Sequence, residues 1–397
     1  MADTSFDTIV VGGGPGGYVC AIRARLLAPP VVIAFQRTTR HAPRSRRWQD
    51  GTRWRGARGG VVMRLTVIGA SVALVLATAG SALAETKVRF VLDWAVQGIH
   101  GMFTLAEDNG HFAKEGLAVK IDRGYGSGDS IAKVASGAYE FGLADIPTLV
   151  TFNAKNPKNK VVAILAQYDK TETSIVALKK SGIKTPKDLV GKTIAAPAGT
   201  SARLLFPIFA AVNGFDAQTI KWVTVKPDIK DSLLLRGEAD AVTAFPSTTL
   251  FFLQSQGVPQ TDAVVLRFAD YGLDLPGNGV IVSEEYAARN PEILKAFVRA
   301  AVKGFRDAAA DHKKAVASAK KHDNLLRTDI EEQRVAMLMQ SSVLTPNVKA
   351  NGFSHIDDAR LARMIAFVAK AMDIADPPKP GEVFRGEFLP AAAERKP

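Results

Sequence analysis

The chain of 397 residues is poor in cysteine, because Cys20 is its only one. The long remainder of the sequence therefore has no thiol for a disulfide bond, a nucleophile or a thiolate metal site. The Gly-x-x-x-x-Gly-Lys-Ser/Thr pattern of ATP-hydrolysing P-loops is also absent, so the sequence does not predict an ATPase of that class. Long uncharged runs are scarce as well, and the one at residues 65–84 divides the chain into two unequal parts.

This uncharged run follows Met63 and Arg64 and ends in the letters SALA. A basic start, an apolar stretch and small residues at the end are the three parts of a secretory signal peptide. We therefore predict that residues 63–84 direct export and are cleaved off, so that the mature chain begins at Glu85. The run would also just span a bilayer, which takes about 20 apolar residues. A retained membrane anchor is the less favoured alternative, because of the Ala-x-Ala end and the glycines and serines within the run.

The formal net charge of +12 is concentrated at the front of the chain. Residues 1–62 hold ten arginines against three acidic residues, whereas residues 85–397 hold 40 basic and 36 acidic residues. The long part is thus almost balanced and lacks the basic excess that nucleic-acid-binding proteins use. We predict no nucleic acid partner.

The front piece begins with a β-branched run at residues 6–11, followed by the letters GGGPGG and a helical pattern. Gly12, Gly14 and Gly17 have the Gly-x-Gly-x-x-Gly spacing that seats a pyrophosphate at a helix N-terminus. Residues 1–28 resemble the amino terminus of dihydrolipoamide dehydrogenase, a flavin disulfide reductase. A flavin oxidoreductase is therefore the function that this fragment alone would suggest.

That resemblance stops after residue 28. Gln36 and Arg37 stand where the family places an acidic residue, and Cys20 lacks the second redox cysteine. Residues 37–60 are rich in arginine, tryptophan and glycine without periodicity. We interpret residues 1–62 as a truncated dinucleotide-binding-like fragment with a disordered arginine-rich stretch, in which the motif glycines are vestigial and bind no cofactor.

From Glu85 onward, β-branched runs alternate with helical patterns, which predicts βαβ units and mostly parallel sheets. We predict an α/β fold of two lobes, each with a mixed or parallel sheet flanked by helices, joined by a hinge. Lobe one takes residues 85–172 and 278–397, and lobe two takes residues 173–277. The helical pattern over residues 291–321 carries an apolar stripe typical of a core-facing helix.

Several segments within residues 86–310 are similar to periplasmic solute-binding proteins of ABC importers, which take up nitrate, taurine, alkanesulfonates and thiamine pyrimidine precursors. The segments, with their first residue numbers, are VRFVLDW at 88, HGMF at 100, EDNGHF at 107, GSGD at 126, SGAYEFG at 136, LVGK at 189, GTS at 199 and GEADA at 237. The pyrimidine-precursor branch is most similar, through the letters LDW and a histidine six positions after the tryptophan. The resemblance implies a periplasmic binding protein fold with a ligand between hinged lobes.

Candidate ligand contacts lie at strand ends and helix starts, the rim where open α/β sheets bind ligands. Trp94 could stack on a planar ligand and Asp93 could accept its N–H groups, while core packing and helix capping are the alternatives. His100 could donate or accept in the cleft, or serve as a surface or capping histidine. Three further candidates occupy matching strand ends or the return crossing: Asp145, Phe245 and Asn278.

Two loops rich in glycine and hydroxyl groups are expected to face each other across the cleft. Their N–H groups and hydroxyls at helix starts suit anionic or carbonyl oxygens, and ordinary N-capping is the alternative. The candidate residues in these loops are Gly126, Ser127, Gly128 and Asp129 in the first and Gly199, Thr200 and Ser201 in the second.

These features predict a periplasmic binding protein rather than an enzyme. It would capture a small nitrogenous or anionic solute, with a pyrimidine precursor favoured and nitrate, taurine or an alkanesulfonate as alternatives. Its partner would be an ABC permease driven by a separate ATPase, and we expect a monomer with no cofactor and no metal. A pyrimidine synthase of the same fold is the enzymatic alternative, but that family is recognised by a cysteine-rich motif and a cofactor lysine, and the chain from Glu85 has no cysteine.

Overall fold

The computed structural model describes residues 9–11, 32–34 and 85–397. The chain divides into two compact units, Met1–Ala79 and Gly80–Pro397. We describe each unit by itself.

In the first unit, β1 (Ile9–Val11) pairs in parallel with β2 (Val32–Ala34). The vestigial motif of Gly12, Gly14 and Gly17 lies outside the described residues. The signal peptide predicted at residues 63–84 lies outside them as well.

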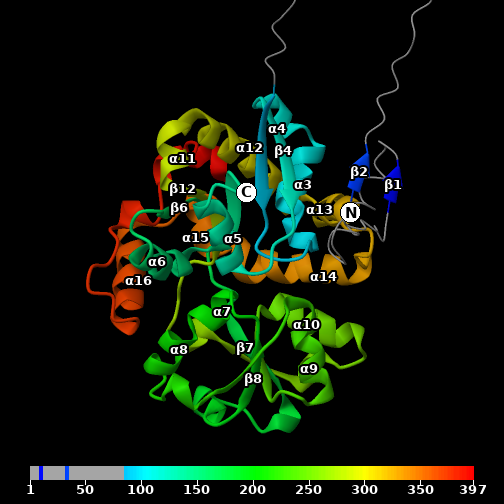
Figure 1. The fold of residues 1–397 in the computed structure, drawn as a ribbon, viewed down its shortest axis with the longest axis vertical. Coiled ribbons are helices and arrows are strands. Elements are labelled where there is room, and N and C mark those ends of the chain that lie inside the picture. Colours follow the sequence, from blue (N-terminus) through cyan, green and yellow to red (C-terminus); the bar gives the residue numbers. More distant parts are fainter. Residues whose placement is uncertain (1–8, 12–31, 35–84) are drawn as a thin grey trace, which may run out of the picture. The chain divides into compact units, whose positions relative to one another are not determined.

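The second unit contains two five-stranded sheets flanked by helices (Figure 1), ordered β4-β3-β5-β12-β6 and β11-β7-β10-β8-β9. The strands of the first sheet are β3 (Thr86–Val91), β4 (Leu117–Asp122), β5 (Phe141–Asp145), β6 (Val161–Ala166) and β12 (Asn278–Ser283). Those of the second are β7 (Ser174–Leu178), β8 (Thr193–Ala196), β9 (Lys221–Thr224), β10 (Ala241–Ala244) and β11 (Ala263–Arg267). Both sheets are mixed, because β12 and β7 run antiparallel to their neighbours. The predicted two-lobed α/β class is confirmed.

We call the bodies around the first and second sheets lobe one and lobe two. The helices of lobe one are α3 (Gly101–Asp108), α4 (His111–Lys114), α5 (Ser127–Ala135), α6 (Ile146–Lys155), α11 (Glu284–Arg289), α12 (Pro291–Ala310), α13 (His312–His322), α14 (Thr328–Leu338), α15 (Pro346–Asn351) and α16 (Asp358–Ala371). Those of lobe two are α7 (Ser201–Leu204), α8 (Phe206–Val212), α9 (Lys230–Arg236) and α10 (Pro246–Ser255).

The single helix predicted over residues 291–321 is wrong at its middle. The chain leaves the helical conformation at Asp311, which separates α12 from α13. The Asp311 carboxylate accepts the backbone N–H of Lys314 at 3.1 Å, and such an N-cap starts a new helix because it satisfies one of its free N–H groups. The predicted apolar stripe of α12 is nevertheless buried.

Lobe one packs its strand β3 between two apolar layers. Val88 and Phe90 of β3 enter one core, whereas Val91 enters the other, as the alternation of side chains along a strand requires. Phe90 packs edge-on against Phe103 of α3 at a centroid distance of 4.9 Å and against Phe297 of α12 at 5.5 Å. This rigid packing holds the end of β3, where the candidate site begins.

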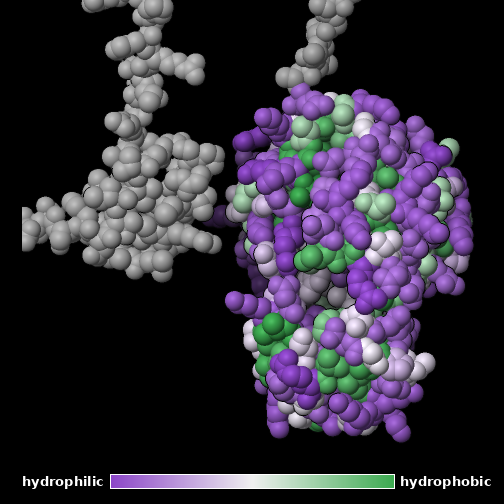
Figure 2. All heavy atoms as spheres, turned by 90° about the vertical axis from the view of Figure 1, so that its right-hand side faces the viewer, coloured by the Kyte–Doolittle hydropathy of each residue, from purple (hydrophilic) through white to green (hydrophobic). Residues whose placement is uncertain are grey.

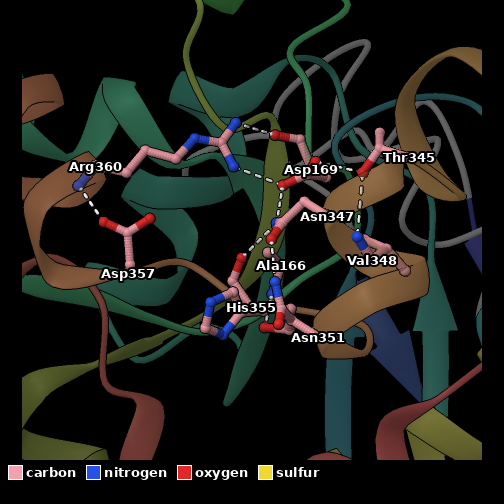
Figure 3. A network of polar contacts seen from close by, with 10 residues as sticks. Ala166, Asp169, Thr345, Asn347, Val348, Asn351, His355, Asp357 and Arg360 are labelled. Atoms are coloured by element: carbon pink, nitrogen blue, oxygen red, sulfur yellow. Dashed lines mark hydrogen bonds and ion pairs between the residues drawn. The ribbon is translucent and has the colours of Figure 1, made fainter.

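The chain crosses to lobe two between β6 and β7 and returns between β11 and β12. Asp169, on the first crossing, accepts hydrogen bonds from Arg360 Nη1 at 2.5 Å, Thr345 Oγ1 at 2.5 Å and Asn347 Nδ2 at 2.8 Å (Figure 3). These bonds attach the crossing to α15 and α16, and α16 also packs against α8 of lobe two. The predicted lobe boundaries at 172/173 and 277/278 stay a prediction.

Among the described residues, no helix combines the length and the apolar character needed to cross a membrane.

Candidate functional site

A pocket lies between the lobes, and both contribute to its wall. From lobe one it is lined by Asp93, Trp94, Gln97, Ile99, His100, Gly126, Ser127 and Tyr168. From lobe two it is lined by Thr200, Ser201, Ala202, Lys230, Thr243, Ala244, Phe245, Ser247 and Thr248. Its cavity volume is about 50 Å³, a few times what one water molecule needs. The lobes are therefore closed on a space for a small guest, and the surface narrows between them in side view (Figure 2).

The carboxylate of Asp93 lies at the end of β3 and is buried. Its Oδ2 accepts a hydrogen bond from Asn278 Nδ2 at 2.7 Å. Its Oδ1 is also buried and has no hydrogen-bond partner in the part of the chain that the structure describes. Because an unpaired buried acceptor is costly, this oxygen is suited to receive an N–H group from a bound molecule.

His100 lies next to this carboxylate, at the end of the short 3-10 helix η2 (Gly98–His100). Its Nδ1 accepts the backbone N–H of Gln97 at 2.9 Å, so the neutral ring carries its proton on Nε2. Nε2 is 3.5 Å from Asp93 Oδ1, which is too long for a strong hydrogen bond. The pocket thus presents one donor and one acceptor side by side, each able to bind a solute.

The two glycine loops face each other as predicted, but they bind to each other directly. The N–H of Gly128 donates to the carbonyl oxygen of Gly199 at 2.8 Å, so it is not free for an anion. Gly126 has φ +119°, and a Cβ there would lie 2.8 Å from the same carbonyl oxygen. Only glycine at this position allows the loops to approach so closely.

Asp145 is fully buried at the end of β5 and caps α6, accepting the Thr148 N–H at 3.2 Å and the Thr148 hydroxyl at 2.9 Å. Its backbone N–H donates to Ser127 Oγ at 3.1 Å. Burial away from water raises the pKa of the Asp145 carboxyl to about 7. This group supports the pocket wall from behind.

Eight of the thirteen predicted contacts line the pocket: Asp93, Trp94, His100, Gly126, Ser127, Thr200, Ser201 and Phe245. Five do not: Gly128, Asp129, Asp145, Gly199 and Asn278. Asp129 instead pairs with Lys133 at 2.7 Å, one turn along α5. The role of all thirteen as ligand contacts stays a prediction.

Several lining residues were not predicted from the sequence, among them Tyr168, Lys230 and Thr243. Thr243 comes at the end of a strand, two residues before the predicted Phe245, so the strand-end rule could have found it. Lys230 gave no such signal, because a lysine at the start of a helix is ordinarily a solvated residue.

The lobes are also joined beside the pocket, where α14 packs against α10. Arg334 of α14 is buried, pairs with Glu331 at 3.0 Å and donates to the carbonyl oxygen of Ser247 in lobe two. Gln97 Nε2 donates to Thr248 Oγ1 across the same junction at 3.2 Å. Within the described residues, no group of three or more His, Cys, Asp or Glu side chains could hold a metal ion.

Two lobes closing on a pocket define the periplasmic binding protein fold, and solved structures of that class superpose on this chain. The alkanesulfonate-binding protein from Xanthomonas axonopodis pv. citri bound to MOPS does so with a TM-score of 0.58 and 17% identity, covering 76% of this chain and 97% of its own. The family model described as NMT1/THI5 like matches residues 97–315, and the chain belongs to this family. The predicted family resemblance is confirmed.

Two relatives show the range of this family. The formylaminopyrimidine-binding protein of Halalkalibacterium halodurans is 28% identical over 230 residues, 57% of this chain and 68% of its own length. The 4-amino-5-hydroxymethyl-2-methylpyrimidine phosphate synthase of Schizosaccharomyces pombe is 24% identical over 226 residues, 55% of this chain and 64% of its own length. Binding proteins and enzymes thus both occur among its relatives.

Proposed function

We propose that this protein is the periplasmic solute-binding component of an ABC importer and captures a small, planar, nitrogen-containing solute between its lobes. The observation that carries the proposal is the buried Oδ1 of Asp93, which has no hydrogen-bond partner within residues 85–397 and lies beside Trp94 in a pocket lined by both lobes. A pyrimidine precursor is favoured, and nitrate, taurine or an alkanesulfonate are the alternatives. The solute would pass unchanged to a permease driven by a separate ATPase.

Binding would take its affinity from two sources in this pocket. Trp94, Tyr168 and Phe245 offer aromatic surface to a flat ring. The Asp93 carboxylate and the His100 Nε2–H would bind polar groups on the edge of that ring. Closure removes water from these groups, which makes each hydrogen bond stronger and each missing one more costly.

The test is a thermal-unfolding screen of the purified protein with formylaminopyrimidine, taurine, nitrate and an alkanesulfonate. A true solute present at 100 times its Kd should raise the free energy of unfolding by about 2.7 kcal/mol. We expect formylaminopyrimidine to give this shift and Trp94→Ala to abolish it.

Trp222→Ala is the matched control, because Trp222 contacts Phe206 and Arg203 away from the pocket. This variant should lower stability but keep the shift caused by the solute. A shift that survives in Trp94→Ala would remove Trp94 from the site. A shift given only by taurine, nitrate or the sulfonate would replace the favoured solute by that alternative.

The enzymatic alternative has a specific reason to be tested, because a relative is named as a pyrimidine phosphate synthase. We propose that no bond of the solute is made or broken, in keeping with the lack of cysteine after Cys20. The solute released by heating the complex should have its original mass in a mass spectrometer. A changed mass in the wild-type sample, but not in a heated blank, would contradict the binding-protein proposal.

A further inference from the structure

Lys230 is a charged residue buried at the edge of the candidate site. It is the first residue of α9, it is only 3% exposed, and it lines the pocket from lobe two. Lysine side chains are rarely this buried unless they are paired. The position therefore needs a physical reason.

Part of that reason is local pairing. Lys230 Nζ donates to Asp231 Oδ1 at 2.5 Å and to Thr249 Oγ1 at 2.9 Å. Thr249 Oγ1 in turn donates to Asp231 Oδ1 at 2.8 Å, so the three side chains form a closed triangle. An ammonium group carries three N–H donors, and within residues 85–397 these two oxygens take only two of them. One N–H of the Lys230 ammonium is therefore left over.

A second polar group on the same wall lacks a partner. The hydroxyl of Thr243, at the end of β10, is buried, lines the pocket and has no hydrogen-bond partner within residues 85–397. Lobe two therefore offers a spare ammonium N–H and a spare hydroxyl. Lobe one offers the spare carboxylate oxygen of Asp93. Each lobe thus brings polar groups to the pocket: the Asp93 oxygen beside the His100 Nε2–H in lobe one, and the Lys230 ammonium with the Thr243 hydroxyl in lobe two.

We propose that Lys230 is a solute contact whose third N–H, together with the Thr243 hydroxyl, binds a hydrogen-bond acceptor on the solute when the lobes close. This inference rests on the proposed binding function and deepens it. It implies a solute with two different ends, an N–H donor for Asp93 and a carbonyl or anionic oxygen for Lys230. A small oxyanion without N–H groups could accept a hydrogen bond from Lys230 but would offer no donor to Asp93. Its negative charge would also repel the Asp93 carboxylate.

The competing explanation is that Lys230 serves only to join α9 to α10 through Asp231 and Thr249. A purely structural lysine would affect every ligand of the pocket alike. A contact to one group of the solute would affect only ligands that carry that group. Matched ligands that differ in the acceptor alone therefore separate the two explanations.

The experiment measures Kd by calorimetry for two ligand pairs. The first pair is formylaminopyrimidine and the same aminopyrimidine with an uncharged alkyl group in place of its formylamino group, and the second is taurine and ethylamine. Wild-type protein is compared with Lys230→Met, which keeps the length of the side chain but removes the charge. Lys226→Met is the matched control, because Lys226 is exposed and does not line the pocket.

In each pair whose acceptor-bearing ligand binds wild-type protein, Lys230→Met should raise the Kd of that ligand about 10- to 100-fold. This is the range for losing a hydrogen bond to a charged group. The Kd of the ligand without the acceptor should change less than about twofold, and Lys226→Met should leave the Kd of both ligands unchanged. Equal losses for both members in Lys230→Met would overturn the contact and leave the proposed function intact. Failure of all four ligands to bind wild-type protein would instead refute the contact with a two-ended solute, and failure of nitrate and the alkanesulfonate as well would refute the proposed function.

Discussion

At the scale of single residues, the site depends on polar groups that are buried before any solute arrives. Asp93, Asp145, Thr243 and Asn278 each keep a buried side-chain oxygen without a partner within residues 85–397. Such groups lower the stability of the closed protein and favour whatever molecule completes their hydrogen bonds. Of these four, Asp93 and Thr243 line the pocket, where a bound solute could complete their hydrogen bonds, whereas Asp145 and Asn278 lie behind it.

Asp145 allows this cost to be measured through pH. Burial raises its carboxyl pKa from 3.8 to about 7, so the folded state holds a proton that the unfolded state releases. The stability that this proton provides is complete below pH 4 and is lost as pH rises to about 7. At 1.36 kcal/mol for each pH unit, the loss is about 4 kcal/mol.

Asp145→Asn keeps a good N-cap for α6 but cannot ionise. Urea unfolding of both proteins from pH 4 to pH 8 should show the variant gaining stability relative to wild type up to about pH 7, with no further gain above it. A difference that is constant over this range would contradict the raised pKa.

At the scale of elements, closure depends on two loops that meet without side chains between them. We expect Gly126→Ala to hold the lobes apart, since its Cβ would lie 2.8 Å from the Gly199 carbonyl oxygen. The solute should then bind at least about 10-fold more weakly, because the loss of even one closing hydrogen bond and of close packing amounts to 1–2 kcal/mol. Small-angle X-ray scattering should show a larger radius of gyration for this variant.

Gly137→Ala provides the control for backbone strain alone. Gly137 also has a positive φ, +73°, but a Cβ there would meet nothing within 4 Å. This variant should lose about 1–2 kcal/mol of stability and bind the solute like wild type. Equal binding by both variants would show that the contact between the loops does not control closure.

At the scale of the whole molecule, the described part of the second unit begins just after the predicted signal peptide. The first strand, β3, starts at Thr86 and pairs with β4 from Leu117 onward. Cleavage after Ala84 would therefore keep all the described strands of both five-stranded sheets. The two lobes and both chain crossings would be retained in the exported protein.

N-terminal sequencing of the protein recovered from the periplasm of an expressing bacterium should give Glu85 as the first residue. Ala84→Pro should block cleavage and retain the chain on the membrane, since signal peptidases require a small residue at this position. A yellow cytosolic protein that begins at Met1 or Ala2 would contradict export and support the flavin alternative.

The sequence by itself determined the alternation of strands and helices from Glu85 and the family, because periodicity, glycine positions and strand-end motifs are local features of the chain. It missed the break at Asp311 that separates α12 from α13. The sequence also proposed Asp93, Trp94 and His100 as ligand contacts; all three line one pocket because they lie on the same connection after β3, and their role in binding stays a prediction. It predicted two opposed glycine loops because each follows the carboxyl end of a strand, one in each lobe.

Only the tertiary structure decided which of these groups are free to bind. The N–H of Gly128 donates to the carbonyl oxygen of Gly199, and the side-chain amide of Asn278 donates to Asp93, so these groups are already hydrogen-bonded. Lys230 comes to the pocket wall because α9 packs against α10, a contact between residues far apart in the chain. Hydrogen-bond partnership and burial depend on such distant neighbours, so no local pattern of letters can specify them.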